Sequence, residues 1–517
     1  MPAEDKYYLK IGKATDLKSP KERLAYRAFE ILPGALAWGT LLGVIFLSWA
    51  KPVWIAVFII AFDVYWLLKT VYLSFHLRSS YFKMRKNIET DWLEKLKEIT
   101  AKNWQDIYQL IVLPVYKELE EVVEESVRAI INSDYPKNKM IVVLAIEERV
   151  GQPGRALAAL IEKKFGDKFF RFLVAAHPDK IAGELAGKGA NAAWAARLAK
   201  KEIIDPLKIP YQNIIVSCFD IDTVVYPKYF SCLTYHYLTS DNPTKTSYQP
   251  VPLYNNNIWQ APAISRVVAT SGTFWQMVQQ QRPERLSTFS SQSISFRALV
   301  DVGFWQTNMV SEDSRIFWQC LLYYDGDYQT EPLYYPVSMD ANLASSFLKT
   351  VFNVYCQQKR WGWGAENIPY LLFGFLKNKK ISLGRKIHWT FVQLEGFWSW
   401  ATNALIIFLL GWLPLYLGGE KFNVTLLSYN LPFITRTLMT LAMVGLIGSA
   451  IYSTLLLPRR PKNYGLIRHL SMIVQWVLVP FTILVFGAIP GLEAQTRLLL
   501  GKYMGFWATP KAKTIGK

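Results

Sequence analysis

The sequence has few of the side chains that build metal centres or disulfide frameworks. Its 517 residues include four cysteines, none in a CxxC pair, and five scattered histidines. This scarcity predicts neither a zinc site nor a disulfide scaffold, and it indicates a reducing compartment. Zinc-finger spacing and repeated aromatic-basic platforms are also lacking, so we expect no nucleic-acid partner although the net charge is +18. A membrane surface or an anionic ligand accounts better for this charge.

Apolar and aromatic residues are abundant instead. Hydrophobic residues make up 51% of the chain, aromatic residues 15%, and charged residues only 19%. Two apolar runs, 31–50 and 53–72, are separated by Lys51-Pro52, and each is long enough to cross a bilayer core of about 30 Å. They predict a transmembrane hairpin over 31–73. Basic residues precede and follow it, so the positive-inside rule places the N-terminal segment 1–30 and the chain after the hairpin in the cytoplasm.

The membrane pattern returns in the last quarter of the chain. Apolar runs near 397–417, 431–457 and 470–490 predict C-terminal transmembrane helices over 391–492, followed by a tail over 493–517. Arg459, Arg460 and Lys462 mark the loop before the last run as cytoplasmic. Three crossings would leave the lysine-bearing tail outside. Either the final run is re-entrant or an extra interfacial segment is present, and the sequence leaves the side of the C-terminus open.

One carboxylate falls inside a predicted crossing. Asp63 lies near the middle of the second apolar run. An ionised carboxylate is costly at this depth and usually faces a bundle interior or an aqueous path, whereas a protonated one can form a helix-packing hydrogen bond. Both interpretations stay open.

Between the membrane segments, strand-like and helix-like patterns alternate. Strands are expected at 111–115, 140–145, 170–175 and 213–218, and helices at 118–132, 156–165 and 190–204. This alternation predicts an α/β domain with a largely parallel sheet over 77–340, with its active site beyond the carboxyl ends of the strands. The segment 341–390 is predicted to form amphipathic helices at the membrane interface.

Two carboxylates follow the last predicted strand. Asp220 and Asp222 are two residues apart after the buried-looking stretch 214–216, so both can project to one side of the chain. Paired carboxylates in this arrangement can share a divalent cation that also grips a diphosphate. An isolated DxD is a weak signal, but its position at a strand end favours a site for Mg²⁺ or Mn²⁺.

Another acidic pair precedes a predicted helix. Asp313 follows Glu312, and a helix dipole favours the ionised form of a carboxylate at its N-terminus. Facing a cavity, such a carboxylate can take a proton from an acceptor hydroxyl. The alternative is a helix cap with no catalytic role.

Two further motifs suit a diphosphate. Lys188 and Asn191 open a predicted helix, where backbone donors and a lysine favour phosphate, but the spacing fails the Walker pattern. Gln357, Arg360 and Trp361 share one helix face at i, i+3 and i+4. Arginine can hold a pyrophosphate bidentately and tryptophan can stack on a sugar, although the same helix can also simply anchor at the membrane.

The order of these motifs resembles one family. The motifs are Pro114-Val115-Tyr116, Lys188-Gly189-Ala190-Asn191, Asp220-Ile221-Asp222, Ser311-Glu312-Asp313 and Gln357-x-x-Arg360-Trp361. Over about half of the chain, this order is similar to that of the family 2 glycosyltransferases, in particular the membrane-bound, cellulose-synthase-like and hyaluronan-synthase-like branch. The resemblance implies a GT-A (Rossmann-like) fold in a cytosolic domain flanked by transmembrane α-helices.

The resemblance also implies roles for individual residues. Asp222 would ligate the metal, Asp220 would contact the nucleotide, and Asp313 would be the base of an inverting transfer. The other expected nucleotide-sugar contacts are Pro114, Tyr116, Glu118, Glu147, Glu148, Lys188 and Asn191, and the expected acceptor and diphosphate contacts are Glu312, Gln357, Arg360 and Trp361. Glu147-Glu148 stands where the family usually has an aspartate pair, and Val302-Gly303-Phe304-Trp305 lacks the family's usual paired glycines.

The implied activity is transfer of a sugar from a nucleotide-diphosphate sugar, with a UDP-sugar favoured, to a growing polysaccharide. The QxxRW pattern is associated with processive members that export the glycan through their own helices. Such a protein would lie in the cytoplasmic membrane as a multi-pass protein, in contact with membrane lipids, with its catalytic domain facing the cytoplasm. Two alternatives remain: non-processive transfer to a membrane lipid, and a catalytically silent scaffold with a transferase fold. A transporter is remote, since it would need more crossings.

Overall fold

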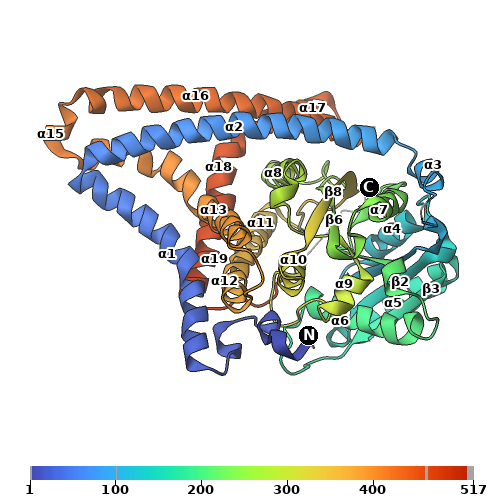
Figure 1. The fold of residues 1–517 in the computed structure, drawn as a ribbon. Helices are drawn as coiled ribbons and strands as arrows, with labels where there is room; N and C mark the ends of the chain where they lie inside the picture. Colours follow the sequence, from blue (N-terminus) through green and yellow to red (C-terminus); the bar gives the residue numbers. More distant parts are fainter. Residues whose placement is uncertain (1–2, 101, 460, 462–463, 509–517) are drawn as a thin grey trace.

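One mixed sheet organises the globular part of the protein (Figure 1). The computed structural model describes residues 3–100, 102–459, 461 and 464–508. Eight strands lie in the order β3-β2-β1-β4-β7-β6-β8-β5. Helices cover both faces of this sheet, and a set of long apolar helices extends from one side of the body.

The first half of the sheet is parallel. It consists of β1 (Tyr108–Val115), β2 (Met140–Glu147), β3 (Arg171–His177) and β4 (Ile214–Cys218). The connecting helices are α4 (Glu120–Ile131), α5 (Gln152–Phe165) and α6 (Lys188–Ala199), which continues into a π-helical turn at Lys200–Ile204. Every residue of β2 is buried, as expected for a central strand covered on both faces. The α/β prediction is therefore confirmed in this half.

The second half of the sheet is mixed. Its strands are β5 (Val224–Val225), β6 (Thr246–Leu253), β7 (Ser293–Ser295) and β8 (Gln329–Ser338). β7 pairs antiparallel with β4 and β6, whereas β6 and β8 run parallel. The register of β6 against β8 shifts between Gln249 and Val251, around Pro250, a residue that cannot donate to a strand ladder. The sheet is thus less uniformly parallel than the sequence predicted.

Alternation along the strands divides the core into two layers. Leu110, Val112, Ile141 and Val143 pack in one cluster, with α6 and α10 (Glu312–Tyr323). Their neighbours Ile111, Leu113, Val142 and Leu144 pack in the other cluster, with α4 and α5. Successive side chains of a strand point to opposite faces, so one apolar run supplies both layers. The remaining helices of the body are α7 (Tyr229–Thr239), α8 (Ala263–Gln280), α9 (Phe296–Asp301), α11 (Phe347–Gly362) and α12 (Asn367–Lys377).

The apolar helices are longer than their hydrophobic runs. They are α1 (Pro20–Ala50), α2 (Pro52–Glu89), α13 (Leu383–Phe408), α14 (Leu413–Leu417), α16 (Leu426–Leu455), α17 (Leu466–Val474), α18 (Val479–Ile483) and α19 (Ile489–Leu499), with short helices α3 (Trp92–Lys97) and α15 (Gly419–Asn423). Among the described residues, four helical stretches are long and apolar enough to cross a membrane. A fifth results if α13 and the segment up to Leu417, bent by 50° relative to each other, form one broken span.

The bend occurs in the first C-terminal run, whereas the final run forms one helical stretch, Leu470–Leu499. α13 begins before the predicted boundary at residue 391, and α19 continues past the predicted start of the tail at residue 493. Arg460, Lys462 and residues 509–517, which entered the predictions on orientation and on the tail, lie outside the described residues.

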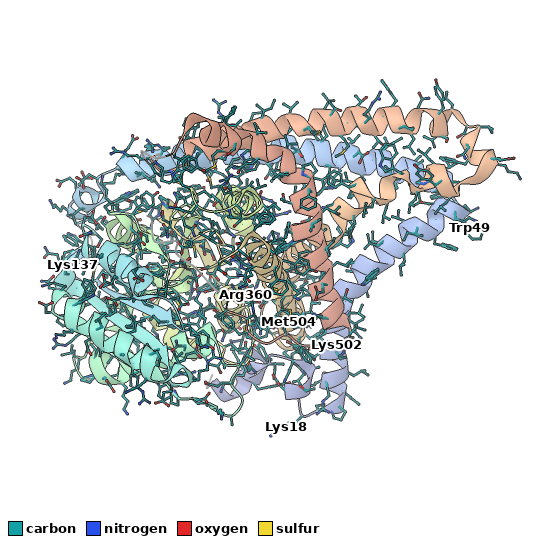
Figure 2. The ribbon with its side chains drawn as sticks, turned by 180° about the vertical axis from the view of Figure 1, so that it is seen from behind. Lys18, Trp49, Lys137, Arg360, Lys502 and Met504 are labelled. Carbon is teal, nitrogen blue, oxygen red and sulfur yellow. The ribbon has the colours of Figure 1, made fainter. Side chains whose placement is uncertain are left out.

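The hairpin of α1 and α2 projects away from the body. Figure 2 shows Trp49 at the outer tip and Lys18 near the opposite end of the same helix. Trp49 is 67% exposed, as suits an aromatic side chain anchored at a membrane interface. Asp63 is buried in α2 next to Thr435 of α16, within the helix bundle. The segment before α1 packs on the body, where Tyr8, Leu9 and other apolar side chains join the core.

Candidate active site

Lys188 lies at the centre of an acidic cluster beyond the carboxyl end of β4. Its Nζ is 2.6 Å from Asp220 Oδ1, 2.8 Å from both carboxylate oxygens of Asp313, and 3.9 Å from Glu312 Oε1. The Lys188 side chain is only 9% exposed. The structure therefore brings together three motifs that are up to 125 residues apart in the sequence.

The close approach of two helix N-termini builds this cluster. Lys188 begins α6, and Glu312 and Asp313 begin α10. A Cβ atom at Gly189 would lie 2.9 Å from the Cβ atom of Glu312, so glycine is needed where the two helices meet. The N-terminus of α10 also carries a partial positive charge that stabilises nearby carboxylates.

The charges in the cluster act differently on the pKa values of its two neighbouring acids, Glu312 and Asp313. Burial raises the pKa of Glu312 to about 8, and the negative charge of Asp313 adds to this effect. Burial also raises the pKa of Asp313, but the ammonium group of Lys188 opposes that rise. Burial alone would lower the pKa of Lys188, yet Asp220 and Asp313 hold it well above its usual value. One lysine cannot neutralise three carboxylates, so we infer that the proton stays on Glu312 and that Asp313 is the ionised member of the pair.

The DxD motif is divided between this cluster and the loop after β8. Asp220 accepts a hydrogen bond from Ser290 Oγ at 2.5 Å, in addition to its ion pair with Lys188. Asp222 is 2% exposed, and its Oδ2 accepts a hydrogen bond from the backbone N–H of Asp340 at 3.0 Å. Within the described part of the chain, no group of three or more His, Cys, Asp or Glu side chains is arranged to hold a metal ion.

The QxxRW motif lies at the end of α11, close to the acidic cluster. The ring of Trp361 is 6.2 Å from that of Tyr254 and 5.7 Å from that of Phe289. The charge of Arg360 acts on both Glu312 and Asp313, and its buried Nε has no hydrogen-bond partner among the described residues. Figure 2 shows Arg360 where the body meets the apolar helices.

A narrow pocket adjoins Trp361. Its lining includes Tyr254, Ser265, Asn342, Gln357, Gln358 and Trp361. Gln357 and Trp361 line it together with Gln358, whereas Arg360, which the spacing placed on the same helix face, is not among its lining residues. The volume of this pocket is about 10 Å³, which has room for about one water molecule, so a larger ligand would require the lining side chains to move.

A second group of predicted residues gathers at the ends of β1 and β2. Pro114 lies in β1, and the backbone N–H of Tyr116 donates to Glu118 Oε2 at 2.7 Å. The guanidinium group of Arg149 lies 4.3 Å from the Tyr116 ring centre and pairs with Glu147. This combination of an aromatic face with paired charges is suited to a flat heterocycle.

Two further residues that were predicted to contact the nucleotide sugar, Glu148 and Asn191, have other partners in the structure. Glu148 is 41% exposed, and its nearest ionic partner is Arg155 at 3.9 Å. Asn191 is buried and donates its amide hydrogen to the carbonyl oxygen of Ala145 at 2.7 Å. This bond fastens α6 to β2, so Asn191 positions Lys188 through the helix.

Sequence reasoning missed Glu366, which supports the start of α10. Its Oε1 accepts hydrogen bonds from the backbone N–H groups of Val310 and Ser311 at 3.1 and 2.9 Å, and its Oε2 accepts one from Trp363 Nε1 at 2.8 Å. The Ser311 side chain makes no capping bond, so Glu366 takes over part of that role. The only sequence signal was its place shortly after Trp361.

The C-terminal segment also reaches the site. A Cβ atom at Gly187, the residue before Lys188, would lie 2.6 Å from Cγ of Phe506. The same Phe506 ring is 5.3 Å from the guanidinium carbon of Arg360. Upstream, the Tyr503 hydroxyl donates to the carboxylate of Glu30 at 2.9 Å. Met504, labelled in Figure 2, packs with Phe506 against the cluster that contains Val310 and Trp363.

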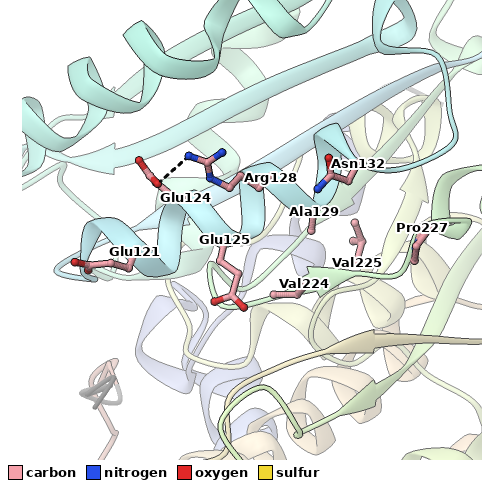
Figure 3. A pocket seen from close by; sticks show the side chains of 9 residues that line it. All are labelled: Glu121, Glu124, Glu125, Arg128, Ala129, Asn132, Val224, Val225 and Pro227. Atoms are coloured by element: carbon pink, nitrogen blue, oxygen red, sulfur yellow. Dashed lines mark hydrogen bonds and ion pairs between the residues drawn. The ribbon is translucent and has the colours of Figure 1, made fainter. Parts of the chain in front are cut away.

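Another hollow of the described surface lies away from these motifs. Figure 3 shows it between α4 and β5, lined by Glu121, Glu124, Glu125, Arg128, Ala129, Asn132, Val224, Val225 and Pro227. It is open and carries no predicted site residue. The motifs, and not this hollow, therefore locate the candidate site.

Solved structures with similar folds share little sequence identity with the chain. No protein-family model and no curated protein matches the chain. The mannosyltransferase PcManGT from Pyrobaculum calidifontis, in complex with GDP-Man and Mn²⁺, is similar at a TM-score of 0.43 and 13% identity, over 76% of this chain and 98% of that chain. TarS 1-349 from S. aureus in complex with UDP-GlcNAc is similar at a TM-score of 0.35 and 9% identity, over 76% of this chain and 92% of that chain. We base the function on the chain's own residues.

Proposed function

We propose that the protein is a membrane-bound glycosyltransferase that moves a sugar from a nucleoside-diphosphate sugar to an acceptor hydroxyl with inversion. The observation that supports this most directly is the Lys188 cluster, in which one buried cation holds Asp220 and Asp313 together. A proton acceptor thus lies next to a DxD carboxylate, at the edge of an α/β sheet where ligands bind.

In this proposal Asp313 is the general base. Lys188 contacts both of its oxygens, which keeps the carboxylate ionised and fixes its orientation. The acceptor hydroxyl gives its proton to Asp313 as its oxygen bonds to the anomeric carbon, and the bond from that carbon to the diphosphate oxygen breaks. Glu312, protonated below a pKa of about 8, can donate a hydrogen bond in the same site.

The leaving diphosphate needs positive charge, and the chain has two sources of it. One is the N-terminus of α6 with Lys188, and the other is Arg360, whose charge also acts on Asp313. Because Arg360 Nε has no partner among the described residues, a phosphate oxygen can fill that place.

The carboxylate Asp222 would hold Mg²⁺ or Mn²⁺ next to the diphosphate. One protein carboxylate, with diphosphate oxygens and waters as further ligands, matches the way Mg²⁺ usually binds. The buried Asp222, which Asp340 N–H orients, fits this role. Such an ion would neutralise charge that develops on the leaving nucleoside diphosphate.

The nucleotide is proposed to lie at the ends of β1 and β2. Tyr116 and Arg149 offer a stacked surface, and Glu147 offers acceptor oxygens for base N–H groups. Pro114, Glu118 and Asp220 border the same edge. Both uracil and guanine present N–H donors to such a site, and we favour a UDP-sugar on the resemblance to family 2.

The acceptor is proposed to be a growing polysaccharide that leaves through the protein's own helices. Two observations support this acceptor path: Trp361 lies beside Tyr254, and Lys69 of α2 pairs with Glu395 of α13 at 3.0 Å among the apolar helices. We place the protein in the cytoplasmic membrane, in contact with lipids, with the body and the basic α1 start on the cytoplasmic side.

A second candidate is single transfer to a membrane lipid. The side chains of Phe347, Leu348 and Phe352 on α11 are exposed, on the helix that carries Trp361, so a lipid-linked acceptor has a path along the membrane interface. Product size distinguishes the candidates: a ladder of long products supports processive synthesis, and one glycolipid supports single transfer. A protein that folds and binds nucleotide but consumes no donor would indicate the silent scaffold.

The role of Asp313 has a direct test. Asp313→Asn keeps the size of the side chain and removes its basicity, so turnover should fall by about a thousandfold or more while nucleotide binding persists. Nucleoside-diphosphate release and calorimetric nucleotide binding measure the two effects. Turnover at the wild-type level would refute the assignment of the base.

A further inference from the structure

A histidine–glutamate pair holds the loop that leads into Lys188. His177 Nε2 lies 2.9 Å from Glu184 Oε2, and the two side chains are 9% and 16% exposed. His177 ends β3, and Glu184 lies in the loop 178–187, which joins β3 to the start of α6 at Lys188. Because a carboxylate oxygen accepts, the imidazole carries the hydrogen of this bond. The bond therefore ties the end of a strand to the loop that ends at the N-terminus of α6.

The backbone of this loop has little other support. Among the described residues, one backbone hydrogen bond joins it to a segment other than its flanking elements, from the N–H of Leu185 to the carbonyl oxygen of Thr307 at 2.7 Å. Lys180 has a φ of +59°, a conformation that is costly for a residue other than glycine. The bond between His177 and Glu184 therefore has a large share in fixing the part of the loop before α6.

The pair lies at the edge of the sheet where the nucleotide is proposed to bind. His177 is the register partner of Glu147 on β2, and its ring is 5.8 Å from that of Trp194 on α6. The charged groups around the pair, from β2, the loop and α6, are Glu147, Arg149, Asp179, Lys180 and Arg197. A change in the charge of His177 thus acts next to the donor site.

Resting on the proposed function, we propose that His177 and Glu184 are positioning residues that hold the loop 178–187, and with it the N-terminus of α6, ready for the donor diphosphate. Histidine ordinarily changes its charge between about pH 5 and pH 8. A charged imidazole binds Glu184 more strongly than a neutral one. When the bond weakens, a smaller fraction of molecules has the loop in place, and the apparent donor affinity falls in proportion to that fraction.

The test measures donor binding by calorimetry for the full chain in nanodiscs, without acceptor, at about pH 6 and about pH 8. UDP- and GDP-sugars are the ligands. His177→Gln keeps a neutral N–H donor near the position of Nε2. Burial raises the pKa of Glu312 to about 8 in every variant, so the quantity compared is the ratio of the dissociation constants of variant and wild type at each pH. The matched control is His236→Asn, which changes a second histidine–glutamate pair, His236 of α7 with Glu331 of β8 at 2.5 Å.

We expect His177→Gln to bind the donor about fivefold more weakly than wild type at the lower pH, and about equally at the higher pH. Glu184→Gln should also weaken binding more at the lower pH, and it provides the test if His177→Gln fails to fold. The control should match wild type at both pH values. Ratios that agree within about twofold at the two pH values would indicate a merely structural bond, which overturns the inference and leaves the proposed function standing. Absence of donor binding by folded wild type contradicts both.

Discussion

Replacing Lys188 by methionine tests the electrostatics of the site. The change keeps the length of the side chain and removes the cation that contacts both oxygens of Asp313 and one oxygen of Asp220. Burial then raises the pKa of Asp313 without opposition from Lys188. Because the base must be ionised to accept a proton, activity should require a higher pH.

The size of this shift follows from the cost of an unpaired buried charge. Breaking a buried ion pair by removing one partner costs about 3–5 kcal/mol. One pKa unit corresponds to about 1.4 kcal/mol, so the full cost would raise the pKa of Asp313 by about two to four units. Arg360 also acts on Asp313 and compensates for part of the loss, so we expect about two units. At a pH below both pKa values, turnover should therefore be about a hundredfold lower than in the wild type.

The assay is the pH dependence of kcat for nucleoside-diphosphate release. In Lys188→Met the acid limb should move about two pH units higher, and activity should recover partly as the pH rises. Lys188→Arg keeps the charge and should leave the limb near its wild-type position. An acid limb of Lys188→Met within half a unit, roughly, of wild type would refute the assignment of Lys188 as the group that keeps Asp313 ionised.

Three further outcomes follow from the same contacts. The pKa of Glu312 is raised from its ordinary value of 4.5 to about 8, so the native protein binds more protons than the unfolded chain between these two pH values. The free energy of unfolding should therefore fall as pH rises through this window, and Glu312→Gln should lose that dependence in thermal melts. Glu366→Ala should lower kcat by about tenfold with little change in donor KM, because the start of α10 loses the carboxylate that accepts two backbone hydrogen bonds. Trp363→Phe removes only one hydrogen bond to Glu366 and should have a smaller effect. Asp222→Asn should raise the Mg²⁺ concentration needed for half-maximal turnover by about tenfold or more, and chelation with EDTA should stop wild-type turnover reversibly; full activity in EDTA would contradict the metal proposal.

The predictable half of the fold is the one with continuous apolar strands. β1, β2 and β4 are buried along almost their whole length, so their residues form apolar runs at the spacing expected of a parallel sheet. β5 and β7 have two and three residues, too few for a periodic pattern. β6 and β8 contain prolines, which argue against a central strand in sequence reasoning, although both pair through the register shift near Pro250.

The site was predictable where chemistry and local structure coincide. Asp220 follows a strand and Asp313 lies at the start of a helix. In the structure both contact Lys188. Glu366 and Phe506 were not predictable, because their contacts depend on tertiary packing. Glu366 meets Val310 56 residues earlier in the chain, and Phe506 meets Gly187 from the far end of the sequence. No local pattern distinguishes such residues from a surface glutamate or a terminal aromatic residue.

The most direct test of the central claim is nucleoside-diphosphate release by the full chain in nanodiscs, screened over UDP- and GDP-sugars with Mg²⁺ or Mn²⁺. Asp313→Asn is the matched control, because it keeps the shape of the site and lacks the base. We predict metal-dependent release from one class of donor that disappears in Asp313→Asn. Equal release from wild type and Asp313→Asn, or no release from any donor by a folded protein that receives its native membrane acceptor, would contradict the account.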